Sequence, residues 1–141
     1  MLSTGKCPQD PKMQAEKNRQ DDILDMTSKL EDVQQKIIAF RNERDWAQFH
    51  DPKNLAEALS IEAGELLENF LWKTTEQSRK LTAEELKNVK EELADIFIFL
   101  TYLSEEYKID LLKEVGSKTE QNASKYPVEK AKGSNRKYTS L

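Results

Sequence analysis

Two pairs of acidic residues at helical spacing, Glu62 with Glu65 and Glu92 with Asp95, are the residues of this sequence best suited to chemistry. Side chains three residues apart lie on one face of a helix, so each pair predicts two carboxylates that point the same way. If the two pairs face each other, their charges need hard cations, and oxygen ligands of this kind favour Mg²⁺ or Mn²⁺. A magnesium site made of carboxylates is suited to binding and cleaving polyphosphates.

The position of Glu62 among apolar residues supports this hypothesis. It stands where a leucine would be expected in a helical seam formed by Leu55, Leu59, Leu66 and Phe70. Burial of a carboxylate without a partner is unfavourable, so an acid in this seam needs a compensating charge.

Three other interpretations of the acids remain open at this point. They can be solvated surface residues, since 26 acidic residues produce such spacings by chance. They can pair with basic residues of the first helix, such as Lys36, Arg41 and Arg44. A di-iron bundle is disfavoured because it needs Glu-x-x-His on two helices, whereas the single histidine, His50, falls in a predicted loop and is expected to be structural.

The hydrophobic pattern predicts an all-α chain of four main helices packed in a bundle, over residues 22–44, 54–72, 82–107 and 110–126. Asn54 is the predicted N-cap of the second helix. Thr82 with Glu85 forms a capping box at the start of the third, and Pro127 ends the fourth. We expect a disordered arm over residues 1–20, one all-α domain over 21–126 and a flexible, polar, basic tail over 127–141.

The composition limits partners and location. The net charge of -4 argues against binding to nucleic acid. The single cysteine, Cys7, excludes an intrachain disulfide and favours a reducing, cytoplasmic location. No apolar run approaches the ~18 residues of a membrane span, and the first 20 residues lack the apolar core of a signal peptide.

Trp46 and Trp72 lie near the two ends of the second predicted helix. One interpretation is simple core packing. The other is an aromatic wall that stacks a nucleobase, where each such contact contributes ~1–3 kcal/mol.

Two stretches that contain the acidic pairs, EAGELLENFLWK (62–73) and EELADIFIFL (91–100), resemble the MazG-like superfamily of all-α nucleoside triphosphate pyrophosphatases. The signature of that superfamily is Glu-x-x-Glu, a spacer of a few tens of residues, then Glu-x-x-Asp. Residues 43–55 and 125–141 are similar to its dCTP pyrophosphatase branch, which includes small single-domain bacterial enzymes. The resemblance covers about residues 30–141.

This resemblance implies a Mg²⁺-dependent reaction of a (d)NTP with water to give the (d)NMP and pyrophosphate, in nucleotide-pool house-cleaning. Glu62, Glu65, Glu92 and Asp95 would be the metal ligands, and either Glu62 or Glu65 the general base. It also implies a homotetramer, a dimer of dimers, with no nucleic-acid or membrane partner. The implied substrate-binding residues are Trp46, Trp72, Lys118, Asn122, Lys125, Tyr126, Lys137 and Tyr138.

The sequence departs from the mammalian dCTP enzymes at two positions near the nucleoside, where Ile37 replaces a histidine and Phe99 replaces a tyrosine. Strict selectivity for cytosine is therefore not expected. Two rival functions stay open: a non-enzymatic helical oligomerisation or regulatory module, and a related phosphohydrolase that acts on dUTP or on damaged nucleotides.

Overall fold

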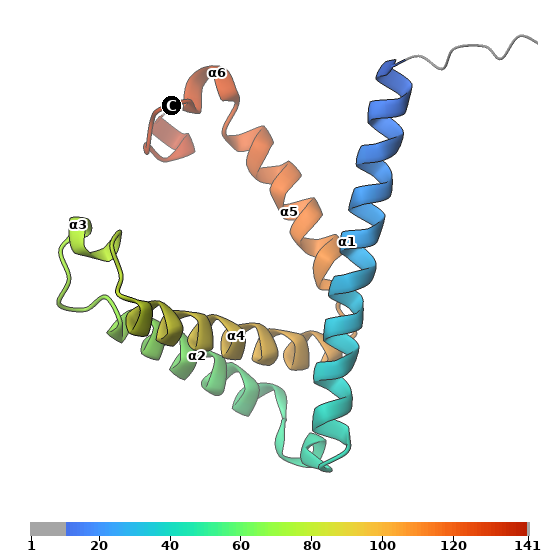
Figure 1. Ribbon diagram of the computed structural model, residues 1–141, viewed down its shortest axis with the longest axis vertical. Coiled ribbons are helices and arrows are strands. Elements are labelled where there is room, and N and C mark those ends of the chain that lie inside the picture. Colours follow the sequence, from blue (N-terminus) through green and yellow to red (C-terminus); the bar gives the residue numbers. More distant parts are fainter. Residues whose placement is uncertain (1–10, 141) are drawn as a thin grey trace, which may run out of the picture. The chain divides into compact units, whose positions relative to one another are not determined.

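The computed structural model describes residues 11–140, which contain six α-helices, two short 3₁₀ helices and no strand (Figure 1). The chain forms two compact units, Met1–Gln48 and Phe49–Leu141. The predicted all-α class is confirmed, and the closed four-helix bundle stays a prediction. None of the described helices has the length and apolar character needed to cross a membrane.

Helix α1, Pro11–Asn42, makes up most of the N-terminal unit. It begins well before the predicted start at residue 22, so that residues 11–20 of the predicted arm are helical in the structure, and residues 1–10 lie outside the described part. Proline is favoured in the first turn of a helix, and the residues that follow are mostly good helix formers. The helix ends before Asp45, whose φ of 53° is left-handed.

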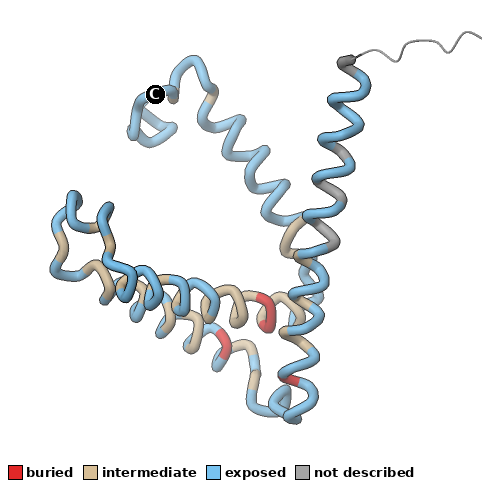
Figure 2. Tube along the Cα trace, in the orientation of Figure 1, coloured by how far each residue is buried: buried red, intermediate tan, exposed pale blue. Residues whose placement is uncertain are grey.

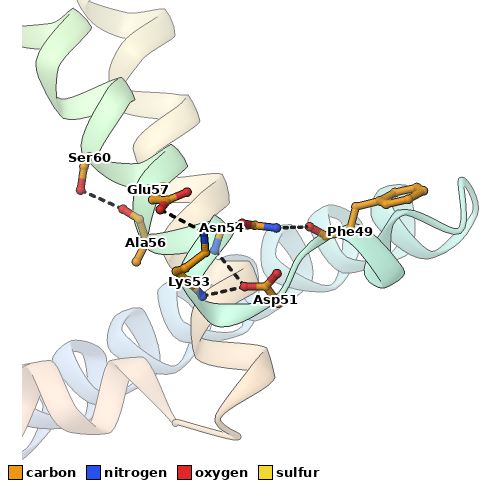
Figure 3. A network of polar contacts seen from close by, with 7 residues as sticks. All are labelled: Phe49, Asp51, Lys53, Asn54, Ala56, Glu57 and Ser60. Carbon is orange, nitrogen blue, oxygen red and sulfur yellow. Dashed lines mark hydrogen bonds and ion pairs between the residues drawn. The ribbon is translucent and has the colours of Figure 1, made fainter.

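Helix α2, Pro52–Glu68, begins earlier than predicted because its N-cap is Asp51 and not Asn54. The Asp51 carboxylate accepts hydrogen bonds from the backbone N–H groups of Lys53 and Asn54, at 2.9 and 3.0 Å (Figure 3). Pro52 fits the first helical position because its missing N–H needs no partner there. The Asn54 side chain instead donates to the carbonyl of Phe49, the last residue of the 3₁₀ helix η1, Trp46–Phe49.

The segment between α2 and the next long helix falls outside the four predicted helices, and it contains the short helix α3, Thr75–Ser78. Thr74 and Gln77 cap this helix reciprocally. Helix α4, Ala83–Glu106, then begins with the predicted capping box of Thr82 and Glu85. Helices α2 and α4 run antiparallel and pack side by side (Figure 1).

The predicted fourth helix is confirmed as α5, Leu111–Lys125. Its N-cap, Asp110, accepts a hydrogen bond from the Lys113 N–H at 3.0 Å. Pro127 follows directly after the C-cap residue, Tyr126. The tail predicted to be flexible contains two helical turns, α6, Val128–Ala131, and η2, Tyr138–Ser140.

Buried residues are few among the described part of the chain, and in the second unit they lie on α2 and α4 (Figure 2). Leu55 on α2 and Tyr102 on α4 are 1% and 4% exposed. On α4, the apolar side chains of Leu86 and Leu93 are exposed. Glu92, Asp95 and Phe99 are half-buried on the same helix.

Candidate metal centre and substrate site

The antiparallel packing of α2 and α4 brings three carboxylates together. Glu62 and Glu65 extend from α2 and Glu92 extends from α4, and one carboxylate oxygen of each lies within 4.8 Å of the other two. Glu62 and Glu92 are half-buried, whereas Glu65 is exposed. The two helices thus gather acids from both predicted pairs, as the spacing required, and their role as metal ligands stays a prediction.

Asp95 lies one turn after Glu92 on the same side of α4 and is half-buried. It is not one of the three acids whose oxygens lie within 4.8 Å of one another. Its charge nevertheless raises the pKa of Glu62, so it belongs to the same electrostatic cluster. We call Glu62, Glu65, Glu92 and Asp95 the acidic cluster.

The pKa of Glu62 lies above its ordinary value of 4.5. The largest cause is partial burial, which removes solvent from the charged carboxylate. The negative charges of Asp95, Glu65 and Glu92 raise the pKa further, and so does a side-chain hydrogen bond to Glu92. The neighbouring acids therefore oppose ionisation of Glu62.

Within the described residues of the second unit, no basic side chain forms an ion pair that relieves this repulsion. None of the ion pairs between described residues includes a member of the acidic cluster. Arg44, one of the predicted partners, pairs with Glu43 at 3.7 Å within the N-terminal unit. The half-buried state of Glu62 and Glu92 also argues against the interpretation as ordinary surface acids.

The size and chemistry of the acidic cluster fit a hard divalent cation. Oxygen ligands bind Mg²⁺ at ~2.1 Å, so two oxygens on opposite sides of one ion lie ~4.2 Å apart. Adjacent ligand oxygens of an octahedral ion lie closer, ~3 Å apart. The three carboxylate oxygens, all within 4.8 Å of one another, need only small side-chain adjustments to reach these distances. Carboxylates without thiol or imidazole ligands favour Mg²⁺ or Mn²⁺ over zinc.

The two tryptophans have different surroundings. Trp72 follows α2, is 91% exposed, and lines a cavity of about 640 Å³ together with Lys73, Gln77 and Glu85. Core packing within the chain therefore does not explain Trp72. Trp46 belongs to the N-terminal unit, where its ring meets the edge of Phe40 at 5.8 Å between centroids, and its role toward a nucleobase stays a prediction.

The predicted substrate residues near the C-terminus form a second group. Lys118 and Asn122 are exposed on α5, and Lys137 is exposed before η2. The rings of Tyr126 and Tyr138 meet edge to face at 5.9 Å, and the Lys125 Nζ lies 5.5 Å from the centre of the Tyr138 ring. The structure thus brings Lys125, Tyr126 and Tyr138 together, and their contact with substrate stays a prediction.

Three further side chains refine the sequence analysis. The His50 ring lies 5.2 Å from the Tyr102 ring, which supports its predicted structural role. Lys73 forms an ion pair with Glu85 that sequence reasoning did not identify. The capping box predicts the position of Glu85 at the start of its helix, but it does not indicate that Lys73 is the partner of this carboxylate.

Comparison with known proteins shows the family of this chain. Residues 58–141, more than half of the chain, match the MazG-like family. The chain is 42% identical over 114 residues to dCTP pyrophosphatase 1 of Homo sapiens, a match that covers 79% of this chain and 67% of the human protein. The corresponding protein of Bos taurus is also 42% identical over 114 residues, with 79% and 68% covered.

A solved structure is also similar to this chain. The crystal structure of a pyrophosphatase from Archaeoglobus fulgidus superposes with a TM-score of 0.65 at 36% identity, and covers 70% of this chain and 92% of that one. The chain belongs to the MazG-like family.

Proposed function

We propose that this chain is a nucleoside triphosphate pyrophosphohydrolase that converts a (d)NTP and water to the (d)NMP and pyrophosphate. The proposed substrate is dCTP or a related, modified deoxynucleotide, whose removal would serve house-cleaning of the nucleotide pool. The acidic cluster carries the proposal, because two antiparallel helices bring carboxylate oxygens of Glu62, Glu65 and Glu92 within 4.8 Å of one another. The similarity to proteins named dCTP pyrophosphatase 1 supports the choice of substrate.

Mg²⁺ is the proposed cofactor, with Mn²⁺ as a substitute, and Glu62, Glu65, Glu92 and Asp95 would hold it. When bound, the metal would neutralise charge on the triphosphate and make a coordinated water more acidic. The residues that remain for binding the nucleotide carry the positive charges and aromatic rings that the acidic cluster lacks.

The proposed reaction needs one proton transfer by the protein. A carboxylate oxygen of Glu62 or Glu65 accepts a proton from the attacking water, whose oxygen forms a bond to the α-phosphorus. The bond from the α-phosphorus to the oxygen bridging to the β-phosphorus breaks, and that oxygen leaves with pyrophosphate. Glu65 is exposed, and its carboxylate is therefore accessible to water.

The remaining predicted residues would orient the nucleotide. Lys118, Lys125 and Lys137 would contact phosphate oxygens as point charges. Trp46 and Trp72 would stack the base, and the high exposure of Trp72 leaves its ring faces free for such a contact. Asn122, Tyr126 and Tyr138 would line the site near the sugar and phosphates.

We also propose that the enzyme is a homotetramer arranged as a dimer of dimers. Large apolar side chains of α2 and α4 are exposed in the single chain, among them Ile61, Leu67 and Leu93. A second copy packed against these helices would cover them. Light scattering coupled to size exclusion measures the mass, and a monomer at micromolar concentration contradicts this part of the proposal.

The function is tested with a panel of canonical and modified NTPs and dNTPs, assayed for pyrophosphate and for phosphate, with Mg²⁺ and with EDTA. We expect pyrophosphate only, in the presence of Mg²⁺, with a dCTP-type nucleotide as the best substrate. A best substrate such as dUTP or a damaged nucleotide would favour the related phosphohydrolase. The absence of any metal-dependent product would favour the non-enzymatic module.

Matched variants locate the activity in the acidic cluster. Glu92→Gln removes one charge of the cluster. Glu91→Gln changes the neighbouring residue, which is exposed and pairs with Lys87 at 3.6 Å. We expect Glu92→Gln to abolish turnover and Glu91→Gln to leave it unchanged, and equal activities of the two variants would refute the assignment.

A further inference from the structure

The connection between α2 and α4 is held in place at several points. The Lys73 N–H donates to the Phe70 carbonyl at 3.0 Å. The next residue, Thr74, caps α3 through a hydrogen bond from the Gln77 N–H to its hydroxyl at 3.2 Å. Trp72 lies between these anchored positions, although its own side chain is almost fully exposed.

One carboxylate joins this connection to the start of α4. An oxygen of Glu85 accepts a hydrogen bond from the Lys73 ammonium group, and its other oxygen accepts one from the Thr82 N–H at 2.8 Å. The Lys73 and Glu85 side chains are only 23% and 33% exposed. The Lys73 hydrogen bond is also the largest cause that lowers the pKa of Glu85, to about 2. The carboxylate thus stays ionised and paired at neutral pH.

This pair lies near the acidic cluster. Glu85 precedes Glu92 by seven residues on α4, so the two residues are almost two full turns apart, on nearly the same side of the helix and about 10 Å apart along its axis. The cavity lined by Trp72, Lys73 and Glu85, of about 640 Å³, has the size of small-molecule sites. It is therefore placed to receive one end of a nucleotide whose phosphates lie at the acidic cluster.

We infer that Lys73 and Glu85 are positioning residues that hold Trp72 as the wall of the nucleoside end of this cavity. The inference rests on the proposed function, and it assigns to the pair a role in substrate affinity and not in the chemical step. Loss of the pair would free the connection while leaving the acidic cluster intact. KM should therefore rise while kcat stays nearly constant.

The test compares three variants by steady-state pyrophosphate release from dCTP with Mg²⁺. Lys73→Met removes the ammonium group, Glu85→Gln keeps a residue suited to the capping box but removes the charge, and Lys73→Arg preserves the ion pair. Lys87→Met is the matched control, because it breaks an exposed pair with Glu91 on the same helix.

We expect Lys73→Met and Glu85→Gln each to raise KM about five-fold, because each removes one partly exposed charge-assisted hydrogen bond. The kcat of both variants should stay within about two-fold of the wild-type value. The double variant should be no worse than either single one, because both changes remove the same interaction. Lys73→Arg and Lys87→Met should behave like wild type. A rise in KM for Lys73→Met alone would mean that Lys73 contacts substrate directly, and would overturn the inference.

A second measurement tests whether the ion pair of Lys73 and Glu85 restrains the connection between α2 and α4. Replacement of Trp46 by phenylalanine leaves Trp72 as the single tryptophan, whose fluorescence anisotropy decay reports local motion of the connection. We expect faster local motion in Lys73→Met and Glu85→Gln than in Lys73→Arg, and equal decays would overturn the inference. A wild-type chain that releases no pyrophosphate would overturn the proposed function and the nucleoside role of the cavity. If the wild type is active but KM is unchanged in both variants, the positioning role of Lys73 and Glu85 is refuted while the proposed function stands.

Discussion

Replacement of Glu92 by glutamine should make the metal-free protein more stable while it abolishes the proposed activity. In the folded chain, a carboxylate oxygen of Glu92 lies within 4.8 Å of oxygens of both Glu62 and Glu65. Unfolding separates these charges, so their repulsion lowers the free energy of unfolding of the wild type. Glutamine has nearly the same shape as glutamate and removes one of the charges.

The magnitude follows from Coulomb's law. Two unit charges at the upper limit of 4.8 Å repel by about 0.9 kcal/mol in bulk water and by about 3.5 kcal/mol at an effective dielectric constant of about 20. Because Glu65 is exposed and the other two residues are only half-buried, we take a value near the lower limit. Glu92 takes part in two such pairs, so the free energy of unfolding in EDTA should rise by about 2 kcal/mol, which raises Tm by about 7 °C for a chain of this size.

Thermal and urea unfolding, followed by circular dichroism at one fixed protein concentration, measure this effect. Glu91→Gln is the control and should leave the stability nearly unchanged. With Mg²⁺, the wild type should become more stable than Glu92→Gln. An ion at a concentration of 100 times its dissociation constant stabilises the wild type by about 2.7 kcal/mol, and the variant by much less. A Glu92→Gln variant that is less stable than wild type in EDTA would refute the claim that the acids repel one another.

Three further predictions concern pH and capping. In EDTA, the contribution of Glu62 to stability should be fully present below pH 4.5 and be lost as the pH rises through its raised pKa, and Glu62→Gln should flatten this dependence in pH-dependent urea titrations. The contribution of Glu85 to stability depends on pH in the opposite direction. Its lowered pKa gives stability that is present above pH 4.5 and is lost as the pH falls toward about 2. In the same titrations, Lys73→Met should weaken that loss. Asp51→Ala should lower the free energy of unfolding by about 1 kcal/mol, measured by urea denaturation, because α2 loses its N-cap.

Local chemistry explains which parts of the fold were predictable from the sequence. The capping box of Thr82 and Glu85 and the stop at Pro127 involve residues a few positions apart, so their geometry follows from the helix itself. The spacing of Asn54 and Glu57 resembles a capping pair and predicts Asn54 as the N-cap. Asp51 competes better, since Pro52 after it is already suited to the first helical position.

Other features needed the three-dimensional arrangement. The start of α1 was missed because residues 13–19 are exposed on every side and carry no apolar stripe. The approach of the two acidic pairs followed from their spacing together with the antiparallel packing of their helices. The contact between Lys73 and Glu85 does not follow from sequence spacing, because the path of the connection between α2 and α4 brings together residues far apart in the sequence.

The binding of Mn²⁺ to the acidic cluster tests the central claim most directly. Electron paramagnetic resonance measures free Mn²⁺ during titration of the wild type, of Glu62→Gln and Asp95→Asn, and of the control Glu91→Gln. We expect the wild type and the control to bind the ion alike, and each cluster variant to bind it at least about ten-fold more weakly, a difference of about 1.4 kcal/mol. Wild-type protein that leaves Mn²⁺ free, or cluster variants that bind it as tightly as wild type, would contradict a metal centre built from these acids.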